Sequence, residues 1–234
     1  MNTHTMQVSE SFRQNADQYD AQRRKLLPCF DDFYGTAVAL ARPDQPNVRV
    51  LELGAGTGLF SAMLLQAWPG MALTLVDNTA AMLVQAQTRL QAWPVELITA
   101  DYDQIPSALN REWLGQWDMV LSALSIHHLT DERKAHLFQQ VHNWLCPGGR
   151  FINADQISGA SPKLERRYWS HWLDAIRSTD LSETAIQDCL ERRALDRTAT
   201  LMDQMNWLQA AGFSTVDLAW RHYGFGVFVA DKSV

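Results

Sequence analysis

Three glycines at alternating positions, Gly54, Gly56 and Gly58, mark the stretch of this chain best suited to bind a cofactor. They follow an apolar run over 48–53 and precede a helical pattern of apolar residues, so they lie where a buried strand turns into a helix. Glycine accepts positive φ in a sharp turn, and without a Cβ it lets a ligand approach the free N–H groups of the helix. The stretch predicts a site for a nucleotide-like cofactor. A turn that serves packing alone is the alternative.

Two acidic residues follow the next two apolar runs. Asp77 ends the run over 72–76, at about the distance from Gly54 at which an acid meets ribose hydroxyls in dinucleotide-binding folds. Asp101, followed by Tyr102, ends the run over 95–99. Because the carboxyl ends of parallel strands line one crevice, we expect both acids beside the glycine turn. For each acid, a helix cap or a turn is the alternative.

Two adjacent histidines, His127 and His128, follow the apolar run over 117–122 and should reach the same edge of the sheet. Histidine titrates near neutral pH, so either side chain could act as a general base. Capping or packing the segment that follows is the alternative. Together with His136 and His142 the pair matches no zinc spacing, and we expect no metal ion.

A parallel sheet is needed to hold these side chains together. Apolar runs that alternate with helical patterns predict an α/β fold with a Rossmann-like doubly wound sheet. The expected strands cover 48–53, 72–76, 95–99, 117–122 and 149–154, and the expected helices cover 58–67, 79–92 and 131–145. Cys146-Pro147-Gly148-Gly149 should stop the last of these helices. A helix over 201–211 and two antiparallel strands, 214–219 and 224–230, should close the sheet around Trp220-Arg221-His222-Tyr223.

The 234 residues are expected to form a single domain over 1–234. Its expected parts are an N-terminal helical lid over 1–46, a core over 47–160, a helical cap insertion over 161–198, and a closing helix and strand pair over 199–234. The lid and the insertion are expected to select the substrate through an aromatic or apolar wall with a few polar handles, with candidates Tyr19, Arg23, Arg24, Phe30, Tyr168, Trp169, Trp172 and Tyr223.

Charge and cysteine content restrict the partners. A net charge of −6 and a pI near 5.6 argue against a broad nucleic-acid or membrane footprint, and the basic pair Arg192-Arg193 is interpreted as a solvated helix face. The three cysteines match no zinc or disulfide framework. No signal-peptide core and no run of about 18 apolar residues is found. We expect a cytoplasmic protein, and a homodimer stays open.

In combination, these motifs resemble the class I S-adenosylmethionine-dependent methyltransferases over most of the chain. The resemblance is carried by Glu52-Leu53-Gly54-Ala55-Gly56-Thr57-Gly58, Val76-Asp77-Asn78 with Met82, Ala100-Asp101-Tyr102, the run over 118–129, and Leu145-Cys146-Pro147-Gly148-Gly149. It implies a seven-stranded, mostly parallel sheet with an antiparallel last strand, and S-adenosyl-L-methionine as the cofactor. Phe12, Ala16, Tyr19, Asp20 and Arg23 resemble the N-terminal lid of members that act on small molecules.

The resemblance also implies roles for individual residues. The glycine turn would contact the methionine part of the cofactor, Asp77 the ribose hydroxyls, and Asp101 with Tyr102 the adenine. The implied cofactor-binding set is Glu52, Gly54, Ala55, Gly56, Gly58, Asp77, Asn78, Met82, Asp101, Tyr102, Ala123, Tyr19 and Arg24, with His127 and His128 as catalytic candidates.

The function implied is methyl transfer to a small-molecule acceptor, with the acceptor atom left open. The layout is also similar to carboxy-S-adenosylmethionine synthase, which has an arginine for its extra carboxylate shortly before the equivalent of Gly212; here Trp207 takes that position, which disfavours the synthase. Such a synthase-like enzyme and a non-catalytic cofactor-binding scaffold are the alternatives. A nicotinamide-dependent oxidoreductase would share the first turn and Asp77, but it leaves the closing strand pair unexplained.

Overall fold

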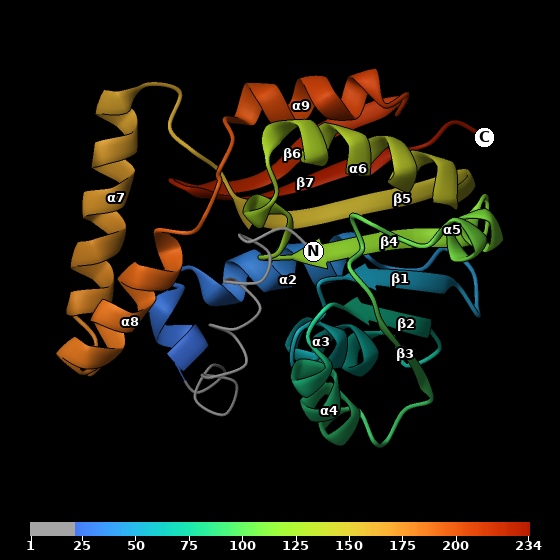
Figure 1. Ribbon diagram of the computed structural model, residues 1–234, viewed down its shortest axis with the longest axis horizontal. Coiled ribbons are helices and arrows are strands. Elements are labelled where there is room, and N and C mark those ends of the chain that lie inside the picture. Colours follow the sequence, from blue (N-terminus) through green and yellow to red (C-terminus); the bar gives the residue numbers. More distant parts are fainter. Residues whose placement is uncertain (1–21) are drawn as a thin grey trace.

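The computed structural model describes residues 22–234, so Tyr19 and the other predicted lid residues before position 22 lie outside the described residues. At its centre is a seven-stranded sheet of order β3-β2-β1-β4-β5-β7-β6 (Figure 1). Only β7 runs antiparallel to its neighbours, β5 and β6. The predicted doubly wound α/β fold with an antiparallel last strand is therefore confirmed. The strands are β1 (Arg49–Leu53), β2 (Ala72–Asp77), β3 (Val95–Thr99), β4 (Trp117–Ala123), β5 (Leu145–Gln156), β6 (Thr215–His222) and β7 (Phe225–Asp231).

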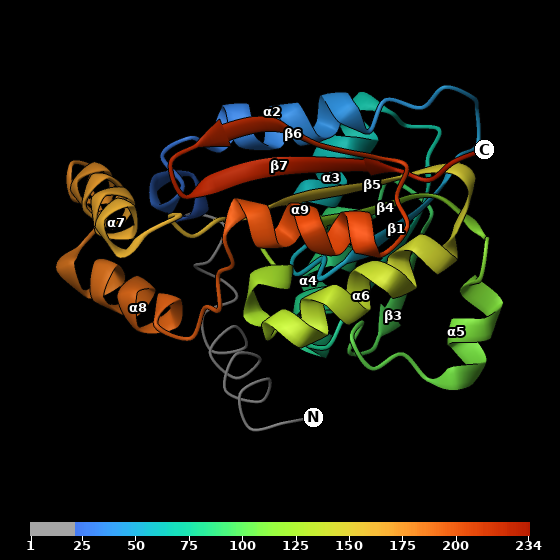
Figure 2. The ribbon, with the colours of Figure 1, turned by 90° about the horizontal axis from the view of Figure 1, so that it is seen from above.

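Helices cover both faces of the sheet (Figures 1 and 2). After a short helix over 22–26, α2 (Phe30–Leu40), α3 (Leu59–Ala67) and α4 (Ala80–Arg89) pack on one face. On the other face lie α5 (Ser107–Trp113), α6 (Asp131–Trp144) and α9 (Leu201–Ala210). Successive strand residues therefore enter different cores: Met119 and Leu121 pack toward α2–α4, and Val120 packs toward the opposite helices.

Two further helices, α7 (Pro162–Arg177) and α8 (Glu183–Arg193), stand beyond the carboxyl ends of the strands, at the left of Figure 1. Ser161 caps α7 by accepting from the Leu164 N–H, and Pro162 occupies its first turn. Trp172 is buried, and its indole N–H donates to the Leu26 carbonyl at 2.9 Å. This bond ties α7 to the N-terminal helical segment at the end of the sheet where the acids were expected.

The helix predicted over 131–145 ends within one residue of that bound, but the motif expected to stop it belongs to the next strand. Helix α6 ends at Trp144, and Leu145 already begins β5, so Cys146-Pro147-Gly148-Gly149 lies within the strand. The Lys232 ammonium donates to the carbonyls of His142 and Leu145, each at 2.8 Å. A cation from the last strand's end thus satisfies the helix terminus, which needs no glycine.

Two other elements differ from the expectation. The strand predicted over 214–219 continues to His222, because the hairpin turn is only Tyr223-Gly224, with Tyr223 at φ 48°. Helix α5 was not predicted. Within residues 22–234, none of the helices combines the length and the apolar character that crossing a membrane requires.

Candidate active site

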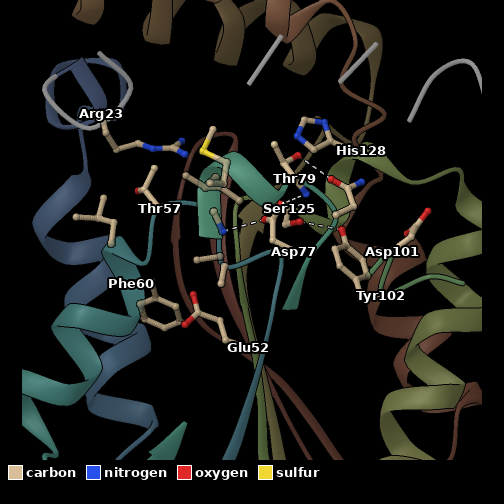
Figure 3. Close-up of a pocket in the computed structure, with 18 of the residues that line it drawn as sticks. Arg23, Glu52, Thr57, Phe60, Asp77, Thr79, Asp101, Tyr102, Ser125 and His128 are labelled. Carbon is tan, nitrogen blue, oxygen red and sulfur yellow. Dashed lines mark hydrogen bonds between the residues drawn. The ribbon is translucent and has the colours of Figure 1, made fainter. Parts of the chain in front are cut away.

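A cavity with about 940 Å³ of empty space, open in part to solvent, lies at the carboxyl ends of β1, β2 and β4 (Figure 3). We call it the first cavity. It is lined by Arg23, Tyr34, Glu52, Gly54, Ala55, Gly56, Thr57, Leu59, Phe60, Asp77, Asn78, Thr79, Met82, Asp101, Tyr102, Ala123, Leu124, Ser125, His128 and Leu129.

The three glycines of the turn all have positive φ, yet they serve different purposes. A Cβ on Gly54 would collide with Ser125, whereas a Cβ on Gly56 would meet nothing within 4 Å and would project into open space. Gly56 therefore leaves room for a ligand. A Cβ on Gly58 would lie 3.1 Å from the Cβ of Ala86 on α4, and Gly58 does not line the cavity. The need for glycine at position 58 is explained by packing against α4, and the structure does not bring Gly58 to the ligand space.

Asp77 pins the turn from the end of β2. One carboxylate oxygen accepts from the Gly56 N–H at 2.9 Å and the other from the Thr79 N–H at 2.8 Å (Figure 3). Burial raises the pKa of Asp77, and these two backbone donors oppose the rise. The acid thus lies in the first cavity beside the glycine turn, where the spacing predicted it.

Glu52 lies deeper, at the end of β1, and is only 1% exposed. Ser61 donates to its carboxyl group at 2.5 Å, but burial raises the pKa of Glu52 to about 8. A carboxyl group held partly protonated in this way would gain from a cationic partner. The first cavity therefore suits a ligand that brings an ammonium group to Glu52, as an amino-acid moiety does.

Asp101 and Tyr102 line the opposite wall, after β3. The Tyr102 hydroxyl and Ser125 share a hydrogen bond of 2.8 Å, and burial raises the pKa of Asp101 while Arg133 lowers it. The Asp101 Oδ2 atom is buried without a hydrogen-bond partner among the described residues and lies 3.8 Å from Arg133. This buried acceptor is available to a donor on a ligand, such as an exocyclic amine. Glu52, which is buried, and Asp77 and Asp101, which are half-buried, together fit an adenosyl amino-acid cofactor.

A second cavity of about 680 Å³ adjoins the first, sharing Arg23, Leu124 and His128 with it. It lies between the segment before α2, the 3-10 turn after β4 and the insertion. It is lined by Arg23, Leu26, Leu27, Leu124, His127, His128, Gln156, Trp172, Cys189, Arg192, Arg193, Leu195, Asp196 and Phe225. The interpretation of Arg192-Arg193 as a solvated helix face was therefore wrong.

His127 is buried between two carboxylates in the wall of the second cavity. Its Nδ1 lies 2.5 Å from Asp155 and its Nε2 lies 3.3 Å from Asp196. Burial opposes protonation, but Asp155 and Asp196 raise the pKa of His127 to about 9. An imidazolium with both nitrogens so engaged has no lone pair for a substrate, and His127 does not line the first cavity. This geometry does not support His127 as a general base.

His128 lies on the boundary between the cavities, with its Nδ1 3.2 Å from Asp196. Burial and the neighbouring charge of His127 lower its pKa, so the ring is neutral near pH 7. The ligand atoms of His127, His128 and Asp196 lie within 4.8 Å of one another, a spacing that could hold a metal ion. Three arginines line the same cavity and oppose a cation there. The absence of a metal stays a prediction.

The first cavity collects most of the cofactor-binding set predicted from the sequence. Arg24 is an exception: it is exposed, pairs with Asp31 at 2.6 Å and does not line the cavity, whereas its neighbour Arg23 lines both cavities. Tyr19 lies outside the described residues. The predicted residues that do line it are Glu52, Gly54, Ala55, Gly56, Asp77, Asn78, Met82, Asp101, Tyr102, Ala123 and His128.

The sequence interpretation missed other lining residues. Tyr34 and Phe60 belong to apolar helical patterns that predict core packing, and nothing in the pattern separates a core ring from a cavity wall. Ser125 could have been found, because it lies two residues after the end of β4, at the edge where Asp77 and Asp101 were expected.

Comparisons with known proteins agree with this geometry. The methyltransferase domain family matches residues 50–149. The carboxy-S-adenosyl-L-methionine synthase of Aeromonas hydrophila is 28% identical over 202 residues, which are 82% of this chain and 78% of that protein. At 28% identity this relative does not decide which reaction the present chain catalyses.

Solved structures share the fold. The magnesium protoporphyrin IX methyltransferase ChlM of Synechocystis PCC 6803, with bound SAM, is 16% identical with a TM-score of 0.66, covering 100% of this chain and 99% of that one. The S-adenosylmethionine-dependent methyltransferase SibL is 21% identical with a TM-score of 0.59, over 85% of this chain and 55% of its own. The family match, the curated relatives and the shared fold together support a class I S-adenosylmethionine-dependent methyltransferase with S-adenosyl-L-methionine as its cofactor.

Proposed function

We propose that the protein transfers the methyl group of S-adenosylmethionine to a small-molecule acceptor bound in the second cavity. The observation that carries this proposal is the shared wall of the two cavities, formed by Arg23, Leu124 and His128. A donor in one cavity and an acceptor in the other would meet at that wall, under the cover of α7 and α8. A covered pocket suits a metabolite better than a macromolecule.

In this proposal the residues of the first cavity hold the cofactor as the resemblance implies. Asp77 takes the ribose hydroxyls, Asp101 and Tyr102 take the adenine, and Glu52 takes the amino group of the methionine part. Gly56 leaves room for the chain between them, since a Cβ there would occupy the open space. When bound, S-adenosylmethionine supplies an electrophilic methyl group on sulfur.

The chain's own contribution to the reaction would be orientation and, for a protonated acceptor, removal of a proton. Positioning alone can supply effective molarities of about 10⁵–10⁸ M. His128 is the candidate base: its ring is neutral, and the carboxylate of Asp196, 3.2 Å from Nδ1, favours the tautomer that carries hydrogen on Nδ1. That tautomer leaves Nε2 free of hydrogen and able to accept a proton.

A second candidate function, modification of the cofactor itself, is favoured by the names of the curated relatives. The sequence argument against it used Trp207, but that residue lies on α9 and lines neither cavity. Its ring lies 6.0 Å from the Lys134 ammonium, on the far side of the sheet from α2–α4. A residue there cannot report on a carboxylate bound at the cavities, so the position does not decide between the two functions.

The test separates binding from chemistry. Calorimetry with S-adenosylhomocysteine should give saturable binding at one site per chain, and no binding would refute the proposal. Turnover is then followed by mass spectrometry of protein incubated with methyl-labelled S-adenosylmethionine and a pool of small metabolites. Label on a metabolite, with S-adenosylhomocysteine formed, supports methyl transfer. A cofactor made heavier by a carboxyl group supports the synthase-like alternative, and tight binding without either product would favour a non-catalytic scaffold.

A further inference from the structure

We propose that the second cavity binds the carboxylate of a small organic acid through Arg192 and Arg193. The inference rests on the proposed function, because it names the chemical class of the acceptor. The observations that support it come from the second cavity and do not require that methyl transfer takes place. Both arginines come from the last turn of α8, and both line the cavity that His127 and His128 also line.

Neither guanidinium has an ion pair or a hydrogen bond with a described residue. Arg193 instead lies among aromatic rings, 4.2 Å from the centroid of Trp172, 5.3 Å from Trp169 and 5.6 Å from Phe225. Burial lowers the pKa of Arg193, although the group stays charged. Stacking on rings fixes the plane of a guanidinium and leaves its N–H edge free, and that edge matches the two oxygens of a carboxylate.

Among the described residues that line the second cavity, one is an acid, Asp196, and its carboxylate is already engaged. Asp196 lies beside His127 and His128 and accepts from the Gln156 amide at 2.8 Å. Although burial opposes ionisation, the two histidines hold the pKa of Asp196 well below its usual range. The imidazolium of His127 is shared between Asp155 and Asp196, so these three groups keep one net negative charge. Arg192 and Arg193 carry two positive charges, and an excess of positive charge remains at the cavity.

Glu165, on α7, also contributes electrostatically to Arg193, and the two side chains line a third cavity together. No hydrogen bond or ion pair joins them, and Glu165 accepts from the Gly159 N–H at 2.5 Å. Among the described residues, the charge of Arg192 and Arg193 thus has no hydrogen-bonded counterion. A largely enclosed cation without an anion is costly, and a bound anion removes that cost.

The rest of the cavity wall is apolar. Leu26, Leu27, Trp172 and Phe225 would contact a hydrocarbon or aromatic body. With the carboxylate at α8 and the body along these side chains, the other end of the acid would lie toward His128 and the first cavity. The same carboxylate chemistry could also be met by a carboxyl group carried on the cofactor, so the experiment includes both sources.

The experiment is a set of calorimetric titrations with matched acid and amide pairs: benzoate, 4-hydroxybenzoate, phenylacetate and indole-3-acetate, each against its neutral amide. The protein is titrated alone and saturated with S-adenosylhomocysteine. We expect at least one acid to bind about tenfold or more tightly than its amide, the difference that one lost charged hydrogen bond makes. Arg192→Gln and Arg193→Gln should remove that preference. Arg111→Gln, on exposed α5, should keep it.

Equal binding of every acid and amide overturns the inference if carboxy-S-adenosylmethionine also binds the two variants as it binds the wild type. A preference for an acid that survives in both variants overturns it as well. If Arg193→Gln fails to fold because the ring stack is lost, Arg192→Gln alone decides. Carboxy-S-adenosylmethionine is the second arm: tight binding that both variants weaken, without a preference for free acids, assigns the carboxylate to the cofactor and supports the arginine site. Failure of S-adenosylhomocysteine to bind would refute the proposed function only, because the acids are also titrated without it.

Discussion

The buried charge of His127 predicts a specific loss of stability as the pH rises. His127 is 4% exposed and lies between Asp155 and Asp196, which raise its pKa from the ordinary 6.5 to about 9. The folded protein therefore binds the proton more tightly than the unfolded chain does. The stabilisation from this group is complete below pH 6.5 and disappears as the pH rises through 9.

The size of the stabilisation follows from the shift in the pKa of His127. Each tenfold change in proton affinity is about 1.4 kcal/mol, so the rise from 6.5 to about 9 corresponds to roughly 3 kcal/mol. This is a large part of the free energy of unfolding of a typical domain, which is about 5–15 kcal/mol.

The assay is urea unfolding of the wild type and of His127→Asn at closely spaced pH values from about 6 to 9.5, followed by tryptophan fluorescence. The variant will be less stable at low pH, but the informative quantity is the difference between the two curves. That difference should shrink by roughly 3 kcal/mol across the range, which removes the contribution of Glu52 and other groups common to both proteins. The matched control His136→Asn, at an exposed position of α6, should show no such change. If the difference in unfolding free energy between the wild type and His127→Asn stays constant with pH, His127 does not carry the buried charge.

Four further outcomes are expected. Asp77→Asn should weaken S-adenosylhomocysteine binding by about 10- to 100-fold, because an amide cannot accept from both backbone N–H groups with two oxygens; unchanged calorimetric affinity would contradict this. Gly54→Ala should lower the free energy of unfolding by about 1–3 kcal/mol because the Cβ collides with Ser125, measured by urea unfolding. Gly56→Ala should abolish cofactor binding while lowering the free energy of unfolding by only about 1–2 kcal/mol. If it destabilises the protein as much as Gly54→Ala does, the space beside Gly56 is not open. His128→Ala should reduce kcat by about 10²–10⁴-fold with little change in cofactor affinity, and unchanged turnover would remove it from the site.

The sheet and most of the first cavity could be predicted because their signals are local in sequence. Apolar runs define the strands, and Asp77 and Asp101 come directly after such runs, so topology alone brings them together. The choice between Arg23 and Arg24 was beyond such reasoning. Successive helical residues point about 100° apart, and the correct one depends on how the helix over 22–26 is rotated against the sheet.

Contacts between distant segments explain the other differences. The charge of His127 depends on Asp155 and Asp196, which are 28 and 69 positions away, and neither spacing forms a motif. The carbonyls at the end of α6 accept hydrogen bonds from Lys232, nearly 90 residues downstream. Arg192-Arg193 looked solvated because the pair follows a polar helix, and only the docking of α8 beyond the strand ends turns the side chains into a cavity.

The close approach of Gly58 to α4 has a consequence for how such a sequence can diverge. A Cβ at position 58 would lie 3.1 Å from the side chain of Ala86, so enlarging either residue demands that the other stay small. The two positions should covary among descendants of this protein, whereas Gly56 should vary with the loss or change of the ligand. One short motif is thus under two independent selective pressures, and a lineage that stops using the cofactor should lose its glycines one at a time.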